Sequence, residues 1–416
     1  MAKKVVVIGG GIMGLSCAYY LQKEGHEVTV LDQAAMDAGA SYVNAGYLTP
    51  SHIIPLSSPG MMAKGLKWML NSSSPFYLKP RLDPDFLRWA WYFHKSSTPA
   101  KVARAIPVIA EINVLSKALY ETMLSSGDLG DFQLVKEGLL MLFKSEKAAA
   151  GERAVMHRAM ELGLEAQELD QQALHRMQPG LSPDIAGAIH YLCDAHTTPT
   201  QVMPLLQQYL RQSGVTLQPQ TEVTGFHAQG TRLSAVLAGE QSFDADEVVL
   251  AAGSWSPLLA RQLGLKLSLQ AGKGYRIDIA RPTPVRLPAI LMETKVAVTP
   301  MEGFTRLAGT MELSGINHHI RENRVRAIAR AAASYYEDFP VEEVEISQAR
   351  CGLRPVSPDG LPYIGRSGQW ENLSLATGHA MMGWSLGPIT GKLISEIVSG
   401  RPTSMALDAL HPDRRF

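Results

Sequence analysis

Three glycines near the amino terminus have a spacing that suits the binding of a phosphate group. Gly9, Gly11 and Gly14 follow the apolar run at residues 5–8 and precede a helical pattern over residues 15–24. In such a turn the first glycine permits a tight bend, the second lets the backbone approach a pyrophosphate, and the third lets the helix pack against the strand. The free N–H groups at the start of the helix can bind phosphate oxygens, so the sequence predicts a dinucleotide site.

An acidic residue stands where such a site needs one. A second apolar pattern over residues 27–31 predicts a strand, and Asp32 follows it directly. A carboxylate at this position can accept hydrogen bonds from the ribose of a dinucleotide. The order of strand, glycine loop, helix, strand and acid favours dinucleotide binding over an ordinary turn between a strand and a helix. It does not distinguish FAD from NAD.

The composition limits the class of protein. The 416 residues are enough for a large core and indicate two domains. The 39 basic residues balance the 39 acidic ones, which leaves no electrostatic footprint for nucleic acid. Three widely spaced cysteines fit a reducing cytoplasm better than a disulfide framework. Because the glycine motif begins near the first residue and no apolar run reaches the length of a membrane span, we expect a cytoplasmic protein without a leader peptide.

Further patterns of a dinucleotide domain recur in the middle and at the end of the chain. Residues 215–219 predict a strand that joins the first two, and residues 246–252 predict another apolar strand that runs into Gly253. Near the end, a strand over residues 373–376 and a helix over residues 388–398 flank a glycine loop. NAD dehydrogenases usually keep this unit contiguous, whereas flavoproteins often interrupt it, so the pattern favours FAD.

The expected fold is α/β, with a Rossmann-like FAD-binding domain built from separated segments and a substrate domain built on an antiparallel sheet. Part of the second domain comes from residues 266–345, which alternate short strands with turns before a long helix over residues 321–338. The expected segments are 1–58, 146–262 and 346–416 for FAD binding, and 59–145 and 263–345 for the substrate domain.

Four further segments carry a family resemblance. They are residues 41–50 (SYVNAGYLTP), 272–275 (GKGY), 352–360 (GLRPVSPDG) and 377–384 (TGHAMMGW). Each resembles a motif of the D-amino acid oxidase superfamily of flavoproteins, and within it the similarity is greatest to bacterial D-amino acid dehydrogenases. The motifs keep the order of the family, and together with the glycine loop they extend over nearly the whole chain.

The resemblance implies an activity and its partners. It implies noncovalent FAD and the oxidation of a D-amino acid by hydride transfer from the α-carbon to flavin N5. The imino acid product would be hydrolysed to a 2-oxo acid and ammonia. Candidate substrates are D-alanine, D-proline and hydroxy-D-proline. In dehydrogenase members the electrons pass to a quinone or another respiratory acceptor, and these members are often attached peripherally to the inner face of the cytoplasmic membrane.

The resemblance also implies a set of cofactor contacts. Backbone N–H groups of the loop at residues 378–387, with the dipole of the following helix, would stabilise the negative charge of reduced flavin. His379 would either add to that stabilisation or cap the loop, and Val223 would contact the adenine through its backbone. The residues expected to bind FAD are Gly9, Gly11, Ile12, Met13, Gly14, Asp32, Ser41, Asn44, Ala45, Gly46, Val223, Ala252, Gly253, Trp255, Gly378, His379, Met382, Gly383 and Trp384.

Arg354 is the candidate for binding the substrate carboxylate, because a guanidinium offers two parallel donors to such a group. The alternative is that Arg354 holds the turn at residues 358–360 through a salt bridge. Tyr275 is predicted to hydrogen-bond the same carboxylate, and its alternative is a half-buried tyrosine of a strand. The remaining pocket candidates are Lys273, on the strand that the resemblance places beside the substrate, and Tyr47 and His52, for which a surface-loop role is the alternative.

Other reactive residues are not assigned a function. His190, Cys193, Asp194 and His196 lie close together in the sequence, but their spacing matches no standard zinc motif, so no metal site is predicted. The adjacent pair at residues 318–319 is interpreted as a solvated turn. Cys351 is interpreted as a buried structural cysteine rather than as an attachment point for flavin.

The segment at residues 59–92 combines aromatic and methionine side chains with lysines and arginines. Such a mixture suits a membrane interface, which predicts a peripheral membrane contact. The alternative is a cover that packs on the substrate domain.

Two other functions remain open at the level of sequence. The first is an oxygen-using oxidase of glycine, sarcosine or a related small amine, which would also bind a carboxylate through Arg354. The second is a flavin-binding, noncatalytic subunit of a larger dehydrogenase. Neither the side-chain specificity nor the electron acceptor follows from the residues.

Overall fold

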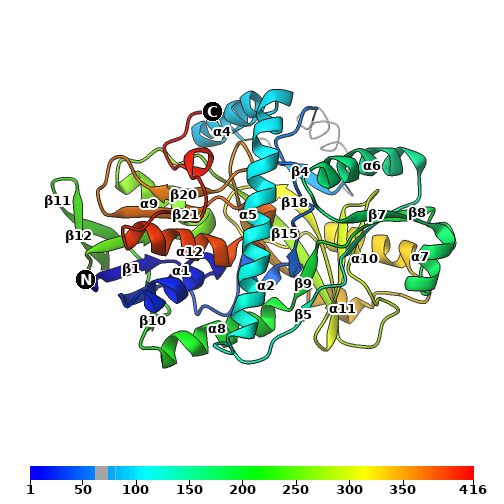
Figure 1. Cartoon of the computed structure of the whole chain (residues 1–416), viewed down its shortest axis with the longest axis horizontal. Helices are drawn as coiled ribbons and strands as arrows, with labels where there is room; N and C mark the ends of the chain where they lie inside the picture. The colour runs from blue at the N-terminus through cyan, green and yellow to red at the C-terminus, as the bar shows by residue number, and fades with distance from the viewer. Residues whose placement is uncertain (61–73, 80) are drawn as a thin grey trace.

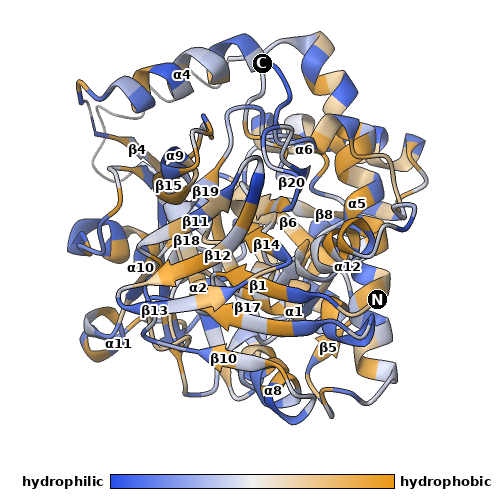
Figure 2. Ribbon diagram, turned by 90° about the vertical axis from the view of Figure 1, so that its left-hand side faces the viewer, coloured by the Kyte–Doolittle hydropathy of each residue, from blue (hydrophilic) through white to orange (hydrophobic). Residues whose placement is uncertain are grey.

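The computed structural model describes residues 1–60, 74–79 and 81–416, and it contains two large β-sheets (Figure 1). The first sheet lies on the left of Figure 1 and the second on the right, with helix α5 (Pro99–Ser125) running vertically between them in this view. Within the described residues, no helix combines the length and the apolar character that crossing a membrane requires. In Figure 2 the strands at the centre of the first sheet are mostly orange, which marks their apolar character.

The first sheet has the strand order β10-β2-β1-β14-β21-β20. All of its pairs are parallel except β20 with β21. The predicted strand at residues 215–219 does join the first two, through the pairing of β10 with β2. The strands are β1 (Lys4–Ile8), β2 (Glu27–Leu31), β10 (Thr216–Gln218), β14 (Glu247–Leu250), β20 (Tyr363–Arg366) and β21 (Leu373–Thr377).

Helices α1 (Ile12–Lys23), α8 (Pro199–Gln212) and α12 (Gly387–Val398) share an apolar core with this sheet. Helices α1 and α12 approach very closely at Gly391, where an added Cβ would lie 2.3 Å from the backbone oxygen of Ser16. A larger residue would therefore push the two helices apart. This close approach places the start of α12 beside the start of α1, at the edge of the sheet where the candidate site lies.

The second sheet has the order β19-β15-β18-β17-β16-β6-β8-β7, and β4 pairs with β18. Its pairs are antiparallel except β16 with β6 and β18 with β4. Helix α10 (Glu322–Tyr335) packs on one face through Val325 and Ile328. The strands are β4 (Phe76–Leu78), β6 (Leu139–Phe143), β7 (Ala166–Asp170), β8 (Gly187–Tyr191), β15 (Gln270–Ile279), β16 (Ala289–Leu291), β17 (Val296–Met301), β18 (Phe304–Leu313) and β19 (Arg350–Val356).

Sheet membership differs from the expected segments in three places. Residues 146–191 were assigned to FAD binding, but β7 and β8 pair with each other and with β6 in the second sheet. Strand β19 was also assigned to FAD binding, yet it pairs with β15 at the edge of the second sheet. Helix α5, assigned to the substrate domain, packs on the core of the first sheet through Ile109 and Tyr120 and on the neighbouring core through Ile106. These pairings join residues far apart in the chain, so local patterns do not reveal them.

Two three-stranded sheets and several helices complete the fold. The expected meander is present as β11 (Gly225–Gln229), β12 (Arg232–Ala238) and β13 (Gln241–Asp244). Strands β3 (Tyr47–Leu48), β9 (Ala195–Thr197) and β5 (Leu134–Val135) form the other small sheet. The further helices are α2 (Ala40–Val43), α4 (Pro84–Ser96), α6 (Glu146–Glu161), α7 (Gln171–Met177), α9 (Ser256–Gln262) and α11 (Glu343–Ser347), with 3-10 turns at Gly253–Trp255, Ala380–Met382 and Asp408–Leu410.

Candidate active site

A cavity of about 520 Å³ lies at the carboxyl ends of β1 and β2 and extends to β19 of the second sheet. Ligands of open α/β sheets bind at this end of the strands. The cavity brings together residues from seven separate parts of the sequence. The expected cofactor residues in its lining are Gly9, Gly11, Ile12, Met13, Asp32, Ser41, Asn44, Val223, Ala252, Gly253, Trp255, His379, Gly383 and Trp384.

Five of the expected cofactor residues do not line this cavity. Gly14 lies behind the glycine loop, where an added Cβ would be 1.8 Å from the oxygen of Gly9. Gly46 and Gly378 have positive φ angles of 79° and 84°, so they shape the backbone of their loops. Ala45 and Met382 contact other side chains instead. The Ala45 carbonyl accepts a hydrogen bond from Thr299, and the Met382 sulfur accepts one from Asn113.

The glycine loop is held in place from both sides. Gly9 adopts a φ of 113°, which only glycine reaches without strain. The amide of Gly10 donates to Asp32 Oδ2 at 2.6 Å, and the amide of Ile12 donates to Ser41 Oγ at 3.0 Å. Gly11 has space, because an added Cβ would meet only Ser41 Oγ, at 3.4 Å. The loop therefore keeps an open position on the cavity side at the start of α1.

His379 is a buried histidine in the cavity wall. Its Nε2 lies 3.0 Å from Thr390 Oγ1, while its Nδ1 is buried and finds no hydrogen-bond partner among the described residues. Burial lowers the pKa of His379 to about 3, so the ring is neutral at physiological pH. A neutral ring supplies no positive charge to a reduced flavin, but its Nδ1 is free to hydrogen-bond a ligand.

Arg354 enters the same cavity from β19. Its Nη1 donates to the carbonyl of Thr310 at 2.9 Å, and no carboxylate of the described residues lies within ion-pair distance. Burial lowers the pKa of Arg354 to about 10, so the guanidinium is still charged at neutral pH. The alternative role in the turn at residues 358–360 is wrong, because Asp359 pairs with Arg414 at 2.7 Å. A partly buried cation without an acid is suited to an anionic ligand.

Tyr275 and Lys273 point away from this cavity, which corrects their predicted roles. Side chains alternate between the faces of a strand, and Arg354 lies over Gly274, so residues 273 and 275 face the opposite side. Tyr275 packs in the core beneath α10, and its hydroxyl donates to Glu312 Oε2 at 2.7 Å. Lys273 Nζ lies 3.2 Å from Glu312 Oε1 and donates to the carbonyl of His319 at 2.7 Å.

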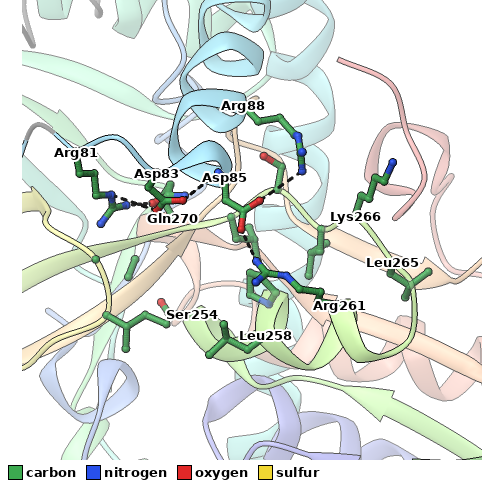
Figure 3. A pocket seen from close by; sticks show the side chains of 17 residues that line it. Arg81, Asp83, Asp85, Arg88, Ser254, Leu258, Arg261, Leu265, Lys266 and Gln270 are labelled. Atoms are coloured by element: carbon green, nitrogen blue, oxygen red, sulfur yellow. Dashed lines mark hydrogen bonds and ion pairs between the residues drawn. The ribbon is translucent and has the colours of Figure 1, made fainter.

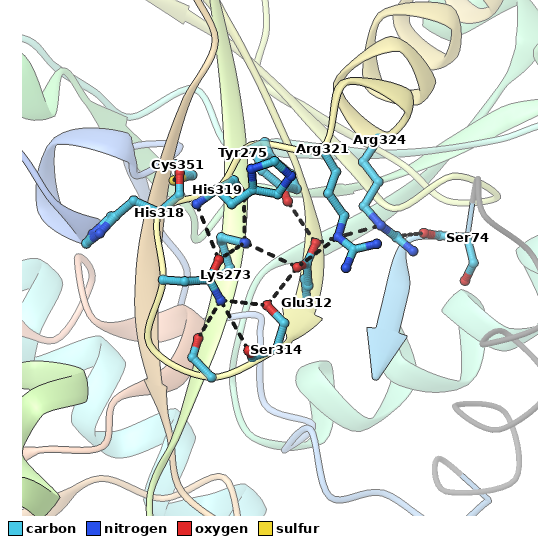
Figure 4. A network of polar contacts seen from close by, with 12 residues as sticks. Ser74, Lys273, Tyr275, Glu312, Ser314, His318, His319, Arg321, Arg324 and Cys351 are labelled. Carbon is cyan, nitrogen blue, oxygen red and sulfur yellow. Dashed lines mark hydrogen bonds and ion pairs between the residues drawn. The ribbon is translucent and has the colours of Figure 1, made fainter. Parts of the chain in front are cut away.

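Figure 4 shows the resulting network around one buried carboxylate. Besides Lys273 and Tyr275, the Glu312 carboxylate receives ion pairs from Arg321 at 3.3 Å and Arg324 at 3.8 Å. The side chain of Glu312 is 1 % exposed, so this charge is almost completely desolvated. Hydrogen bonds from Ser314 and Tyr275, together with the charge of Lys273, hold the pKa of Glu312 below its usual value despite that burial. The network joins β15 and β18 to the start of α10.

Tyr47 and His52 also lie outside the cavity lining. The Tyr47 hydroxyl is shared between the carbonyls of Ala289 at 2.8 Å and Val298 at 3.0 Å. The amide of His52 donates to the Thr49 carbonyl at 3.2 Å, and burial lowers the pKa of its imidazole to about 4. Tyr47 is part of a packed core, whereas His52 is partly buried.

Several residues of the cavity lining were not predicted from the sequence, and among them His318 was assigned a different environment. His318 was interpreted as part of a solvated turn, but its ring stacks on Trp255 at a centroid distance of 6.1 Å and lines the cavity. Its backbone carbonyl accepts a weak hydrogen bond from the partly buried thiol of Cys351 at 3.4 Å. In the loop after β18, Lys273 binds the neighbouring residues Asn317 and His319, and no local pattern indicates that contact.

The residues that lie close in sequence to His190 are separated in the fold. His190 Nε2 lies 2.8 Å from the carbonyl of Glu137, and His196 Nε2 lies 2.9 Å from that of Pro300. Asp194 accepts hydrogen bonds from Ser51. Across residues 1–60, 74–79 and 81–416, no group of three or more histidine, cysteine or acidic residues is placed to hold a metal ion.

A second cavity of about 490 Å³ adjoins the first and shares Ser254 and Leu258 with it (Figure 3). Charged side chains from α4 and α9 meet across it. Asp85 forms ion pairs with Arg88, at 3.4 Å, and with Arg261. The other residues that line this second cavity are Arg81, Asp83, Pro257, Leu265, Lys266, Leu267, Ser268, Leu269, Gln270, Ala271, Gly315 and Ile316.

The residues of the first cavity fit FAD. The glycine loop has open space at Gly11 on the side of the cavity, and Asp32 lies at the end of β2. The buried Nδ1 of His379 has no hydrogen-bond partner among the described residues. A dinucleotide-binding sheet whose cavity extends to a partly buried arginine of a second sheet defines a flavin-dependent oxidoreductase.

The comparison with protein families agrees with this class. Residues 4–397 match the family described as DAO, FAD dependent oxidoreductase, so the chain belongs to that family. FAD is accordingly its cofactor.

Named relatives and solved structures are similar over nearly the whole chain. A protein named D-amino acid dehydrogenase from Neisseria meningitidis serogroup C is 32 % identical over 425 residues, covering 99 % of both chains. One of the same name from Vibrio atlanticus is 30 % identical, covering 98 % of both chains. The structure of glycine oxidase from Geobacillus kaustophilus has a TM-score of 0.80 at 22 % identity and covers 100 % of this chain and 99 % of that one. L-proline dehydrogenase from P. horikoshii has a TM-score of 0.76 at 16 % identity, with coverages of 99 % and 97 %. These two structures share the fold.

Proposed function

We propose that the protein is a D-amino acid dehydrogenase, which oxidises a D-amino acid and passes the electrons to a quinone or another acceptor. The observation that carries the proposal is the charged guanidinium of Arg354, which enters the FAD cavity without an acidic partner among the described residues. A substrate carboxylate would supply the missing negative charge. The names of the relatives from Neisseria and Vibrio support the D-amino acid as substrate class. D-Alanine, D-proline and hydroxy-D-proline are the first substrates to test.

The residues divide the work of the reaction. Arg354 binds the carboxylate through parallel N–H groups and so fixes the position of the α-carbon. When bound, FAD accepts the electron pair and the hydrogen that leave the α-carbon. The substrate amine loses its proton, the product is an imino acid, and water converts it to a 2-oxo acid and ammonia. The glycine loop and Asp32 would hold the cofactor phosphates and ribose, Val223 would contact the adenine, and the neutral His379 would offer a hydrogen bond through Nδ1.

The decisive experiment is an anaerobic titration of the purified holoprotein with paired D- and L-amino acids, followed by the visible flavin absorption. We expect D-isomers to bleach the flavin band and L-isomers to leave it unchanged. Reoxidation by a soluble short-chain quinone, and not by oxygen, would support a dehydrogenase. Rapid reoxidation by oxygen with formation of peroxide would contradict the assignment as a dehydrogenase. A flavin band that no D-amino acid bleaches would overturn the proposed substrate class.

We also propose that the protein works at the inner face of the cytoplasmic membrane, in peripheral contact with it. Part of the predicted interface, residues 61–73 and 80, lies outside the described residues. In the rest, α4 exposes 53 % of Leu87 and 60 % of Trp91 one turn apart, with Arg88 between them. Apolar and cationic side chains on one helix face suit an anionic lipid surface.

Sedimentation with vesicles that contain anionic phospholipid tests this contact. We expect the wild type to sediment with the vesicles and Leu87→Glu/Trp91→Glu to remain in solution. Met160→Glu is the matched control, because Met160 on α6 is 49 % exposed and lies outside this face. Equal sedimentation of all three proteins would exclude α4 as the contact.

A further inference from the structure

We propose that Gly274 and the bulge at Thr310 are positioning residues for Arg354. The missing side chain at Gly274 makes room for the guanidinium, and the carbonyl of Thr310 sets its direction. The inference rests on the proposed function, in which Arg354 binds the substrate carboxylate. It adds two residues that do not touch the substrate and act through Arg354.

Gly274 is needed for space rather than for backbone freedom. Its φ angle is not in the positive region that favours glycine, so its backbone conformation is open to any residue. An added Cβ, however, would lie 2.2 Å from Nη1, 2.3 Å from Nη2 and 2.4 Å from Cζ of Arg354. The guanidinium therefore occupies the place of a side chain at residue 274. Any larger residue there must displace the charged group.

A bulge in β18 faces Gly274. Lys273 pairs with Glu312 and Tyr275 pairs with Gly309, so one residue of β15 lies opposite two residues of β18. One of these two is Thr310, whose φ of 71° is rare for a β-branched residue. The Thr310 carbonyl accepts the hydrogen bond from Arg354 Nη1 at 2.9 Å. Strained backbone of this kind is retained where it serves a site.

Together the two features fix the guanidinium from two directions. The flat surface of β15 at Gly274 lies against the group, and the Thr310 carbonyl binds one of its five N–H donors. No acid among the described residues pairs with the others. The remaining donors are thereby kept for a ligand of the cavity, in an orientation that is set before the ligand arrives.

The test is the variant Gly274→Ala, studied as the FAD-loaded protein. We expect it to retain FAD, because residue 274 does not line the cofactor cavity. The KM for a D-amino acid should rise at least tenfold, with a much smaller change in kcat. Titration with sodium propionate, followed by the shift of the flavin spectrum, should show at least a tenfold weaker carboxylate affinity. Unchanged affinity for propionate would overturn the proposal.

A double-mutant cycle of thermal unfolding separates a positioning role from a general packing defect. Gly274→Ala should lower Tm in the wild-type background and have little effect in the Arg354→Met background, where the clashing group is gone. Arg354→Gln serves as a second background should the first fail to fold. Gly272→Ala is the control, because its Cβ would meet Met311 and Val356 and should lower Tm in every background. Equal losses for Gly274→Ala in all backgrounds would overturn the inference.

The two readouts also separate this inference from the proposed function. The unfolding cycle measures contact between residue 274 and Arg354 and needs no substrate. Should the cycle show coupling while propionate fails to bind the wild type, the positioning is correct and the carboxylate role is wrong. Should the wild type bind propionate while the cycle shows no coupling between residues 274 and 354, the carboxylate role of Arg354 stands and the positioning role of Gly274 is wrong.

Discussion

At the scale of single residues, the site depends on a partly buried charge that no acid of the described residues neutralises. Desolvation lowers the pKa of Arg354, and its hydrogen-bond partner is a backbone carbonyl. A pKa of about 10 leaves it protonated across the physiological range. Keeping such a group costs folding free energy, and a bound carboxylate would recover part of it.

We expect Arg354→Ala to weaken substrate binding while FAD stays bound. Loss of a charged, bidentate contact costs roughly 2–5 kcal/mol. The KM for the D-amino acid should therefore rise by about 30-fold or more. Steady-state kinetics and the ratio of flavin to protein absorbance measure the two parts. Wild-type kinetics in the variant would contradict the assignment of Arg354.

Gly11 offers the complementary test of the cofactor loop. An added Cβ meets only Ser41 Oγ at 3.4 Å, so we expect Gly11→Val to fold but to lose FAD, because the side chain would occupy the approach of the phosphates. Gly14→Ala is the matched control: its Cβ would lie 1.8 Å from the oxygen of Gly9, and it should lose the fold itself. Circular dichroism and flavin content distinguish the two results. A yellow, fully loaded Gly11→Val protein would exclude the phosphate role.

At the scale of elements, the sequence predicted the first sheet well and the second sheet poorly. The glycine loop, β10 beside β2, and the terminal strand and helix follow from local periodicity and turn residues. The predicted helices over residues 171–177 and 199–213 are confirmed as α7 and, apart from its last residue, α8. In contrast, β6 and β8 pair across more than 40 intervening residues, and nothing local specifies such a partner.

The candidate site was predictable to the same degree. Residues of the glycine loop and of the segment at 377–384 reach the cavity because they follow strands whose carboxyl ends meet there. Tyr275 was misplaced because a motif identifies a strand but not its inward face, and alternation puts Arg354 and Tyr275 on opposite faces. His318 was missed because its loop is positioned by the distant Lys273.

A buried carboxyl beside β9 predicts a dependence of stability on pH. Asp194 accepts hydrogen bonds from the amide of Ser51 at 3.0 Å and from its hydroxyl at 2.5 Å. Burial raises the pKa of Asp194 to about 7. Between about pH 4 and pH 7 the folded state therefore holds a proton that the unfolded state has lost. The free energy of unfolding should fall as the pH rises through this window and then level off.

We expect Asp194→Asn to remove this contribution, because the amide keeps the shape and cannot ionise. The variant should be more stable than the wild type at pH 8, by roughly 2–4 kcal/mol, and similar to it at pH 4. Guanidinium unfolding at pH 4, 6 and 8 measures the effect. A variant that keeps the wild-type slope between pH 4 and pH 7 would show that another group is responsible.

At the scale of the whole molecule, the cofactor cavity joins the two large sheets. Its lining takes the loops of β1 and β2 from the first sheet and Leu353, Arg354 and Pro355 from the second. Helix α5 contacts cores on both sides, and the Tyr120 hydroxyl donates to the carbonyl of Trp384 beside the cavity at 2.7 Å. A ligand that fills this space contacts both halves of the protein at once.

FAD should therefore stabilise the entire chain and not only the glycine loop. A ligand that binds only the folded state adds about 2.7 kcal/mol at a concentration one hundred times its Kd. We expect the Tm of the apoprotein to lie below that of the holoprotein and to rise steadily as FAD is added back. The Tm of Gly11→Val should match that of the apoprotein and not respond to FAD, since its fold is intact and its phosphate approach is blocked. Differential scanning calorimetry over a series of FAD concentrations makes the measurement. Should added FAD raise only a second, separate transition, the two sheets would unfold independently and the cavity would not join them.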